Sequence, residues 1–176
     1  MQIIVLGMHR SGTSTVARLL NLMGAYFAPE GMEMPPDSGN PKGYWERRDV
    51  YTLNKEFLWA LHSDWYQVSH LDLNQVPEEA VEAFQEKARK IILGMDANRP
   101  WMIKEPRMNL LLPLWYPLLE CPLAIQVYRN PLQVAKSVHR RNGFPIPFSL
   151  ALWEFYTLQA LRHSQGVPTL LLSYEA

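Results

Sequence analysis

The chain has 176 residues, enough for one domain with a sizeable core, and 48% of them are hydrophobic. Its 17 basic and 17 acidic side chains cancel, which argues against nucleic acid as a partner and requires any anion site to be local. No apolar run approaches the ~20 residues that a membrane-spanning helix needs.

Apolar patterning predicts strands and helices that alternate along the chain. In chain order, we expect a strand over 2–7, a helix over 13–23, a long Pro/Gly-rich loop over 25–44, a helix over 47–61, a linker to 76, a helix over 77–95, a strand over 101–103, a proline-interrupted helix over 107–119, a strand over 123–128, helices over 131–141 and 147–164, and a strand over 169–172. The last helix is apolar nearly all round, so we expect it to be largely buried.

This alternation predicts an α/β fold. The predicted strands are solidly apolar, which is typical of a parallel sheet covered on both faces. We expect a three-layer sandwich of four to five strands, formed by residues 1–176 as a single domain. The strand at 2–7 should be central, with 101–103 on one side, 123–128 on the other, and 169–172 outside that.

The single cysteine and the early first strand bear on the compartment. Cys121 alone excludes an internal disulfide and a cysteine-rich metal site. A strand that begins at residue 2 leaves no room for a signal peptide. We therefore expect a reducing compartment and a cytoplasmic protein.

The segment from Gly7 to Ser14 follows the first strand and opens the first helix. Its spacing fits the phosphate-binding pattern G-x-x-x-x-G-K-[ST] except that Thr13 replaces the lysine that reaches the β- and γ-phosphates. Arg10 is the candidate replacement cation. The segment therefore predicts an anion cradle at a helix N-terminus for a nucleotide without a triphosphate tail, and it makes the expected three-layer sandwich one of the P-loop type. The alternative is a tight turn that binds nothing.

Three strands should deliver cations to one edge of the sheet. Arg10 follows the first strand, Lys104 follows the second, and Arg129 follows the third. Ligands of parallel sheets bind at the carboxyl ends of the strands, so we expect an anionic ligand there. Arg129 can form a fork on a phosphate, and Ser137 of the following helix can donate to the same group. The alternatives are an arginine paired with a carboxylate and charges that solvate strand ends.

Three segments together resemble the sulfotransferase family, which uses 3′-phosphoadenosine 5′-phosphosulfate (PAPS). They are residues 9–14, the turn 129–131 with Ser137 after it, and the closing residues 172–175. The resemblance runs from residue 3 to the C-terminus, although residues 25–100 carry little of it. It is closer to carbohydrate and bacterial members than to the cytosolic members that sulfate phenols and steroids.

The resemblance implies a PAPS-dependent sulfotransferase that moves a sulfuryl group to a hydroxyl acceptor, for which a carbohydrate is one candidate, without a metal ion. It implies that Arg129 and Ser137 bind the 3′-phosphate. The loop would hold the 5′-phosphosulfate through Arg10, Ser11, Gly12, Thr13 and Ser14.

The resemblance also bears on the catalytic base. Carbohydrate and tyrosylprotein members carry a catalytic glutamate after the first helix, and Glu46 is the matching position. Cytosolic members use a histidine two residues after a strand-end lysine, where this chain has Pro106. His9 and Glu105 remain candidates. Arg10 and Lys104 are expected to stabilise charge on the leaving phosphate.

Several alternatives stay open. The family usually continues past the last strand into a glycine-rich segment with a basic residue, whereas this chain ends at Ala176. Either the chain is a fragment or another element does that job. A magnesium-dependent nucleotide or small-molecule kinase with a degenerate loop, and a non-catalytic nucleotide-binding module, are the other functions considered. Tyr44, Trp45 and Trp65 either stack on an acceptor or simply pack the protein.

Overall fold

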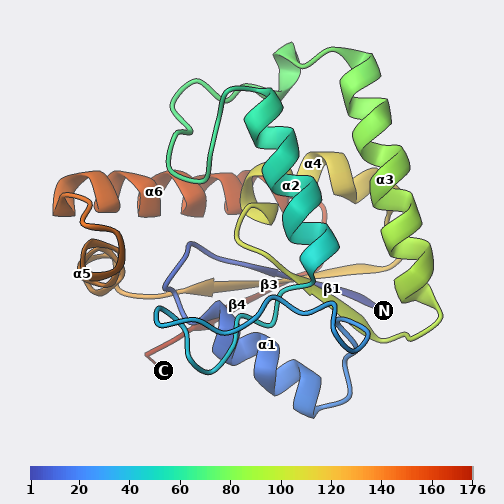
Figure 1. Cartoon of the computed structure of the whole chain (residues 1–176), viewed down its shortest axis with the longest axis horizontal. Coiled ribbons are helices and arrows are strands. Elements are labelled where there is room, and N and C mark those ends of the chain that lie inside the picture. The colour runs from blue at the N-terminus through green and yellow to red at the C-terminus, as the bar shows by residue number, and fades with distance from the viewer. Residues whose placement is uncertain (176) are drawn as a thin grey trace.

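The computed structural model describes residues 1–175, which form a parallel sheet flanked by helices (Figure 1). The strands are β1 Gln2–Leu6, β2 Trp101–Lys104, β3 Pro122–Tyr128 and β4 Thr169–Ser173. The helices are α1 Thr13–Leu22, α2 Arg48–Ala60, α3 Glu78–Asp96, α4 Met108–Trp115, α5 Pro131–Asn142 and α6 Ile146–His163, with short 3₁₀ turns at Leu73–Gln75 and Tyr116–Leu118. Every predicted element is present, and the bounds differ by a few residues.

The strand order is β2-β1-β3-β4, and all three pairings are parallel. In the register, Ile4 of β1 lies between Ile103 of β2 and Ala124 of β3. The predicted strand order is therefore confirmed. Because the strands run the same way, their carboxyl ends meet at one edge of the sheet, where parallel sheets bind ligands.

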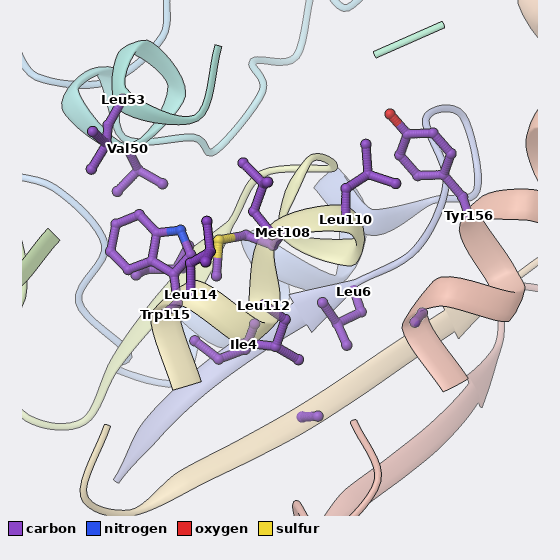
Figure 2. Close-up of a cluster of buried hydrophobic side chains, with 14 of the residues drawn as sticks. Ile4, Leu6, Val50, Leu53, Met108, Leu110, Leu112, Leu114, Trp115 and Tyr156 are labelled. Atoms are coloured by element: carbon purple, nitrogen blue, oxygen red, sulfur yellow. The ribbon is translucent and has the colours of Figure 1, made fainter. Parts of the chain in front are cut away.

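Side chains of the central strand alternate between two apolar layers. Ile4 and Leu6 face the larger core, which includes side chains of α2, α3, α4 and α6. Figure 2 shows Ile4 and Leu6 beside the side chains of α4 in this core. Ile3 and Val5 face the smaller core with Val16 of α1. Figure 1 shows α1 alone below the sheet and α2, α3 and α6 above it, which confirms the three-layer arrangement.

Two sequence expectations about burial are wrong. Helix α6 buries only one stripe of side chains, while Phe148, Leu158 and Leu161 are exposed. Strand β4 is an edge strand in the part of the chain described, and Leu170 and Leu171 on it are more than half exposed, at 52% and 58%. Apolar composition alone does not say whether a neighbouring element covers a side chain, and here none of the described elements does.

A chain of hydrogen bonds between buried polar groups joins α2 to α4. Trp115 Nε1 donates to Asn54 Oδ1 at 2.9 Å, and Asn54 Nδ2 donates to Glu105 Oε2 at 2.7 Å. The other carboxylate oxygen, Glu105 Oε1, accepts from Arg107 Nη1 at 2.6 Å. Removing one member of such a network leaves its buried partners unpaired, and an unpaired buried polar group costs free energy.

Replacing Asn54 with leucine should therefore destabilise the fold by about 1–3 kcal/mol, since it leaves Trp115 and one oxygen of Glu105 without partners. Urea unfolding would measure the free-energy difference. The control is Asn98→Leu at an exposed position just after α3, which should change stability by less than about 0.5 kcal/mol. Equal stabilities of the two variants would show that the network contributes nothing.

Candidate functional site

A cavity of about 200 Å³ opens where β1, β2 and β3 end. Polar and charged side chains dominate its wall. The lining comes from the loop after β1 (His9, Arg10, Gly12), the first turn of α1 (Thr13, Ser14, Thr15), the long loop (Asn40, Tyr44, Glu46), the ends of β2 and β3 (Lys104, Pro106, Arg129), α5 (Arg141) and the end of β4 (Tyr174). The predicted meeting of strand-end cations at one edge is therefore present.

The loop after β1 can wrap this cavity because two of its residues lack a Cβ. Gly7 has φ 147°, and a Cβ there would lie 2.6 Å from the carbonyl oxygen of Val127 on β3. Gly12 has φ 94°, and a Cβ there would collide with the ring of Tyr174. Both positions therefore need glycine for a positive φ and for close approach.

Asn109 of α4 holds the start of the loop. Its Oδ1 accepts from the Gly7 backbone N–H at 2.9 Å, and its Nδ2 donates to the Gly7 carbonyl at 3.0 Å. A single buried amide thus fixes both backbone groups of Gly7. Nothing in the sequence signals this pairing, because the two residues lie 102 positions apart.

Helix α1 presents its N-terminus to the cavity. Within residues 1–175 no side chain caps this end, and Thr13, Ser14 and Thr15 of the first turn line the cavity wall. The N–H groups of a first helical turn have no partners within the helix, and the helix dipole adds partial positive charge. This arrangement suits a bound anion.

Arg10 is held between α5 and the long loop. Its Nε donates to Ser137 Oγ at 3.0 Å, and its Nη1 donates to the Gly39 carbonyl at 2.8 Å. Ser11 and Ser137 are buried and are not part of the cavity wall. The structure therefore brings Arg10 and Ser137 together, although the sequence assigned them to different phosphates.

The end of the long loop lies against the first turn of α1. Asn40 Nδ2 donates to Ser14 Oγ at 3.3 Å, and Ser14 Oγ donates to the Tyr44 carbonyl at 3.3 Å. The Tyr44 hydroxyl donates in turn to Asp37, 2.7 Å from either carboxylate oxygen. These contacts make the loop one wall of the cavity.

A buried ion pair joins two candidate catalytic residues. Lys104 Nζ lies 2.6 Å from Glu46 Oε1, and both side chains are less than a tenth exposed. Burial raises the pKa of Glu46 above its usual range, and Lys104 opposes that rise. A carboxylate held ionised by a cation yet made more basic by burial is suited to accept a proton. Glu46 does not cap α2, since Arg47 is the N-cap and no side-chain capping bond forms among the described residues.

The other two candidate bases lie in different settings. Glu105 is fully buried and both of its oxygens are bonded, to Asn54 and Arg107, so it supports the fold. The ring of His9 packs 4.6 Å from that of Trp65, and its buried Nε2 has no hydrogen-bond partner in the described chain. Burial, reinforced by surrounding arginines and Lys104, lowers the pKa of His9 well below 6.5, which makes its ring a weak base.

Arg129 lines the same cavity as the ion pair of Lys104 and Glu46. Its guanidinium stacks on the Tyr174 ring at 4.8 Å, and Nη1 donates to the Arg10 carbonyl at 3.4 Å. Nη2 donates to Gln133 at 2.8 Å, and Glu175 lies 3.8 Å from Nε. Nε itself is buried without a hydrogen bond to any described residue. These contacts therefore fix the guanidinium of Arg129 and leave its Nε as a donor without a hydrogen bond in the described chain.

Sequence reasoning missed Arg141 and Asn40 as parts of the wall, whereas Tyr174 lies within the closing residues 172–175 that carry part of the resemblance. Arg141 lies four residues after Ser137, one helical turn further along the same face of α5, and this spacing was an available signal. Asn40 lies in the long loop, where the sequence gives no such indication. Residues 1–175 contain no group of three or more His, Cys, Asp and Glu side chains that could hold a metal ion.

Residues 2–168 match a protein-family model described as the Sulfotransferase family. No curated protein sequence matches the chain. None of the described helices is both long and apolar enough to cross a membrane.

Three solved structures share the fold. The sulfotransferase domain of the Synechococcus PCC 7002 olefin synthase has a TM-score of 0.60 at 20% identity, and the match covers 99% of this chain and 66% of that domain. TT1252 from Thermus thermophilus has a TM-score of 0.50 at 16% identity, covering 98% of this chain and 87% of that one. The deoxyadenosine kinase from M. mycoides with bound dATP has a TM-score of 0.50 at 11% identity, covering 100% and 92%.

The partly buried ring of His9, whose Nε2 is buried without a partner in the described chain, predicts a loss of stability in acid. Its pKa in the folded protein lies well below the ordinary 6.5, so the unfolded chain takes up a proton that the folded protein does not. Stability should therefore fall as the pH drops below about 6.5, until the pH reaches the folded-state pKa. Urea unfolding of wild type and His9→Asn between pH 7 and 5 would measure this, and the variant should show the flatter dependence. The exposed His62 gives the matched control, His62→Asn, and parallel curves for wild type and His9→Asn would contradict the prediction.

Proposed function

Because the chain belongs to the sulfotransferase family, we propose that it transfers a sulfuryl group from PAPS to the hydroxyl of an acceptor, for which a carbohydrate is one candidate. The observation that carries this proposal is the convergence of an uncapped helix N-terminus, Lys104, Arg129 and Glu46 on one cavity. The chain spans 66% of the length of the olefin synthase sulfotransferase domain. A cytoplasmic location is kept as a prediction.

The cavity suits the donor nucleotide. The N-terminus of α1 and the wall residues Thr13 and Ser14 suit the 5′-phosphosulfate. The free Nε of Arg129 and its stacked guanidinium suit the 3′-phosphate. Ser137 Oγ accepts a hydrogen bond from Arg10. It therefore acts on that phosphate either by positioning Arg10 or by donating to the phosphate once Arg10 has moved away. When bound, the donor supplies the sulfuryl group.

The residues of the chain perform the remaining chemistry. Glu46 accepts the proton of the acceptor hydroxyl as that oxygen bonds to sulfur, and the bond from sulfur to the phosphate oxygen breaks. The electron pair of the broken bond stays on the phosphate, where Lys104 and the N–H groups of α1 stabilise it. Lys104 is paired with Glu46 and lines the same cavity as the loop after β1, so one cation serves both the base and the leaving group.

Two other functions remain as alternatives. The deoxyadenosine kinase shares the fold at 11% identity, and a kinase would need Mg²⁺ to bridge the β- and γ-phosphates. Thr13 occupies the position of the lysine that usually reaches those phosphates, which favours a donor without a triphosphate. A non-catalytic module would bind 3′-phosphoadenosine 5′-phosphate (PAP) and transfer nothing, and a transfer assay separates it from an enzyme.

Arg129→Ala should weaken binding of PAP by about 1.5–3 kcal/mol, the range for a lost hydrogen bond to a charged group. The loss should be smaller for adenosine 5′-phosphate, which lacks the 3′-phosphate. Calorimetric titration of both nucleotides measures the difference, with Arg89→Ala at an exposed position of α3 as the control. Equal losses for the two nucleotides would show that Arg129 does not read the 3′-phosphate.

Glu46→Gln should leave PAP affinity nearly intact and lower turnover roughly 10²–10⁴-fold, the usual contribution of a positioned general base. Release of PAP from PAPS, measured with a panel of sugars and phenols, gives the rate. In wild type the rate should fall as the pH drops through the raised pKa of Glu46, because the base must be ionised. Glu56→Gln on the exposed face of α2 is the control. Full activity of Glu46→Gln would remove Glu46 from the mechanism.

A further inference from the structure

A second cavity, of about 450 Å³, adjoins the first. Its wall comes mostly from the long loop, with side chains from α2, the segment after α2, the end of β2 and α5. Four residues line both cavities: His9, Tyr44, Glu46 and Arg141. The volume falls within the range of small-molecule sites.

The shared wall gives this cavity a role in the proposed reaction. Glu46, the proposed base, faces both spaces. A molecule in the second cavity can therefore bring a hydroxyl to Glu46 while the donor nucleotide fills the first. This assignment rests on the proposed function, and it makes the second cavity the acceptor site.

Two arginines with spare hydrogen-bonding capacity line the second cavity. Arg107 is paired with Glu105 at 2.6 Å and lies 3.9 Å from Asp64, but its buried Nε has no hydrogen-bond partner in the described chain, and its guanidinium lies 4.9 Å from the ring centroid of Tyr51. The guanidinium of Arg141 lies 5.4 Å from the ring centroid of Trp65, and no described carboxylate comes within ion-pair distance of Arg141. Stacking on an aromatic ring holds a guanidinium in place while its edge stays free to donate.

The acids in this wall are already engaged. Asp37 accepts from the Tyr44 hydroxyl and from the backbone N–H groups of Gly39 and Asn40. Glu46 is paired with Lys104. Arg141 instead has another cation, Arg10, as a close neighbour, and burial and this neighbour lower the pKa of Arg141. An anion bound at Arg141 would relieve that repulsion.

We propose that the acceptor is a hydroxy acid, a small hydroxyl compound that carries a carboxylate, and that Arg141 and Arg107 bind this carboxylate. A planar carboxylate matches the planar fork of a guanidinium. The two arginines fix one end of the acceptor and leave its hydroxyl beside Glu46. Trp65 and Tyr51 then act by holding the arginines, rather than by stacking on the acceptor.

The test uses matched pairs of ligands that differ only in charge. The whole chain is first titrated with PAP and then, saturated with PAP, with 4-hydroxybenzoate, 4-hydroxybenzamide, glucuronate and glucuronamide. Each carboxylate should bind at least about tenfold more tightly than its amide, as expected for charge-assisted hydrogen bonds. Arg141→Gln should remove most of that preference, and Arg140→Gln, at the exposed neighbouring position of α5, should keep it.

Three results would overturn the proposal. The first is that a carboxylate and its amide bind with equal affinity. The second is that Arg141→Gln lowers the affinity for both by the same factor. The third is that neither carboxylate binds at any soluble concentration. The first titration keeps the proposed function separate. A protein that does not bind PAP but still prefers carboxylates through Arg141 would refute the sulfotransferase proposal and support the anion site.

Discussion

The close approach of Gly7 to β3 is the constraint on which the site depends. With no Cβ at Gly7, the loop after β1 passes against the Val127 carbonyl, and Asn109 holds both backbone groups of Gly7. This turn sets where α1 begins and therefore where its unpaired N–H groups lie. A larger residue at Gly7 would move the helix N-terminus away from the strand ends that supply Lys104 and Arg129, and the cavity would lose its shape.

The cations gathered at this edge set the chemistry of the site. Lys104 is neutralised by Glu46 inside the protein, at the cost of burying both charges. Arg10 and Arg141 have no such partner within residues 1–175 and lie near each other, which is unfavourable without an anion. Two neighbouring cations without carboxylate partners in one cavity wall suit an anionic ligand there, even though the total charge of the protein gives no sign of one.

Elements and strand order were predictable because strong periodicity and short connections leave few topologies. The glycine-bounded loop between β1 and α1 was predictable because its pattern is local in the sequence. The role of Asn109 was not predictable, since its partner Gly7 is 102 residues away. The exposure of α6 was not predictable either, since composition does not say which element packs against a helix. Arg141 could have been found from its spacing to Ser137, but the second cavity depends on how the long loop folds over α2 and α5.

Titration of the metal-free protein with PAP and with ATP tests the central claim most directly. The account predicts that PAP binds in the presence of EDTA, that ATP binds more weakly, and that added Mg²⁺ does not reverse this order. The reason is that the cavity offers a helix N-terminus and arginines but no lysine at Thr13 to reach a triphosphate. Binding of ATP that requires Mg²⁺ and exceeds that of PAP would contradict the account and favour a kinase.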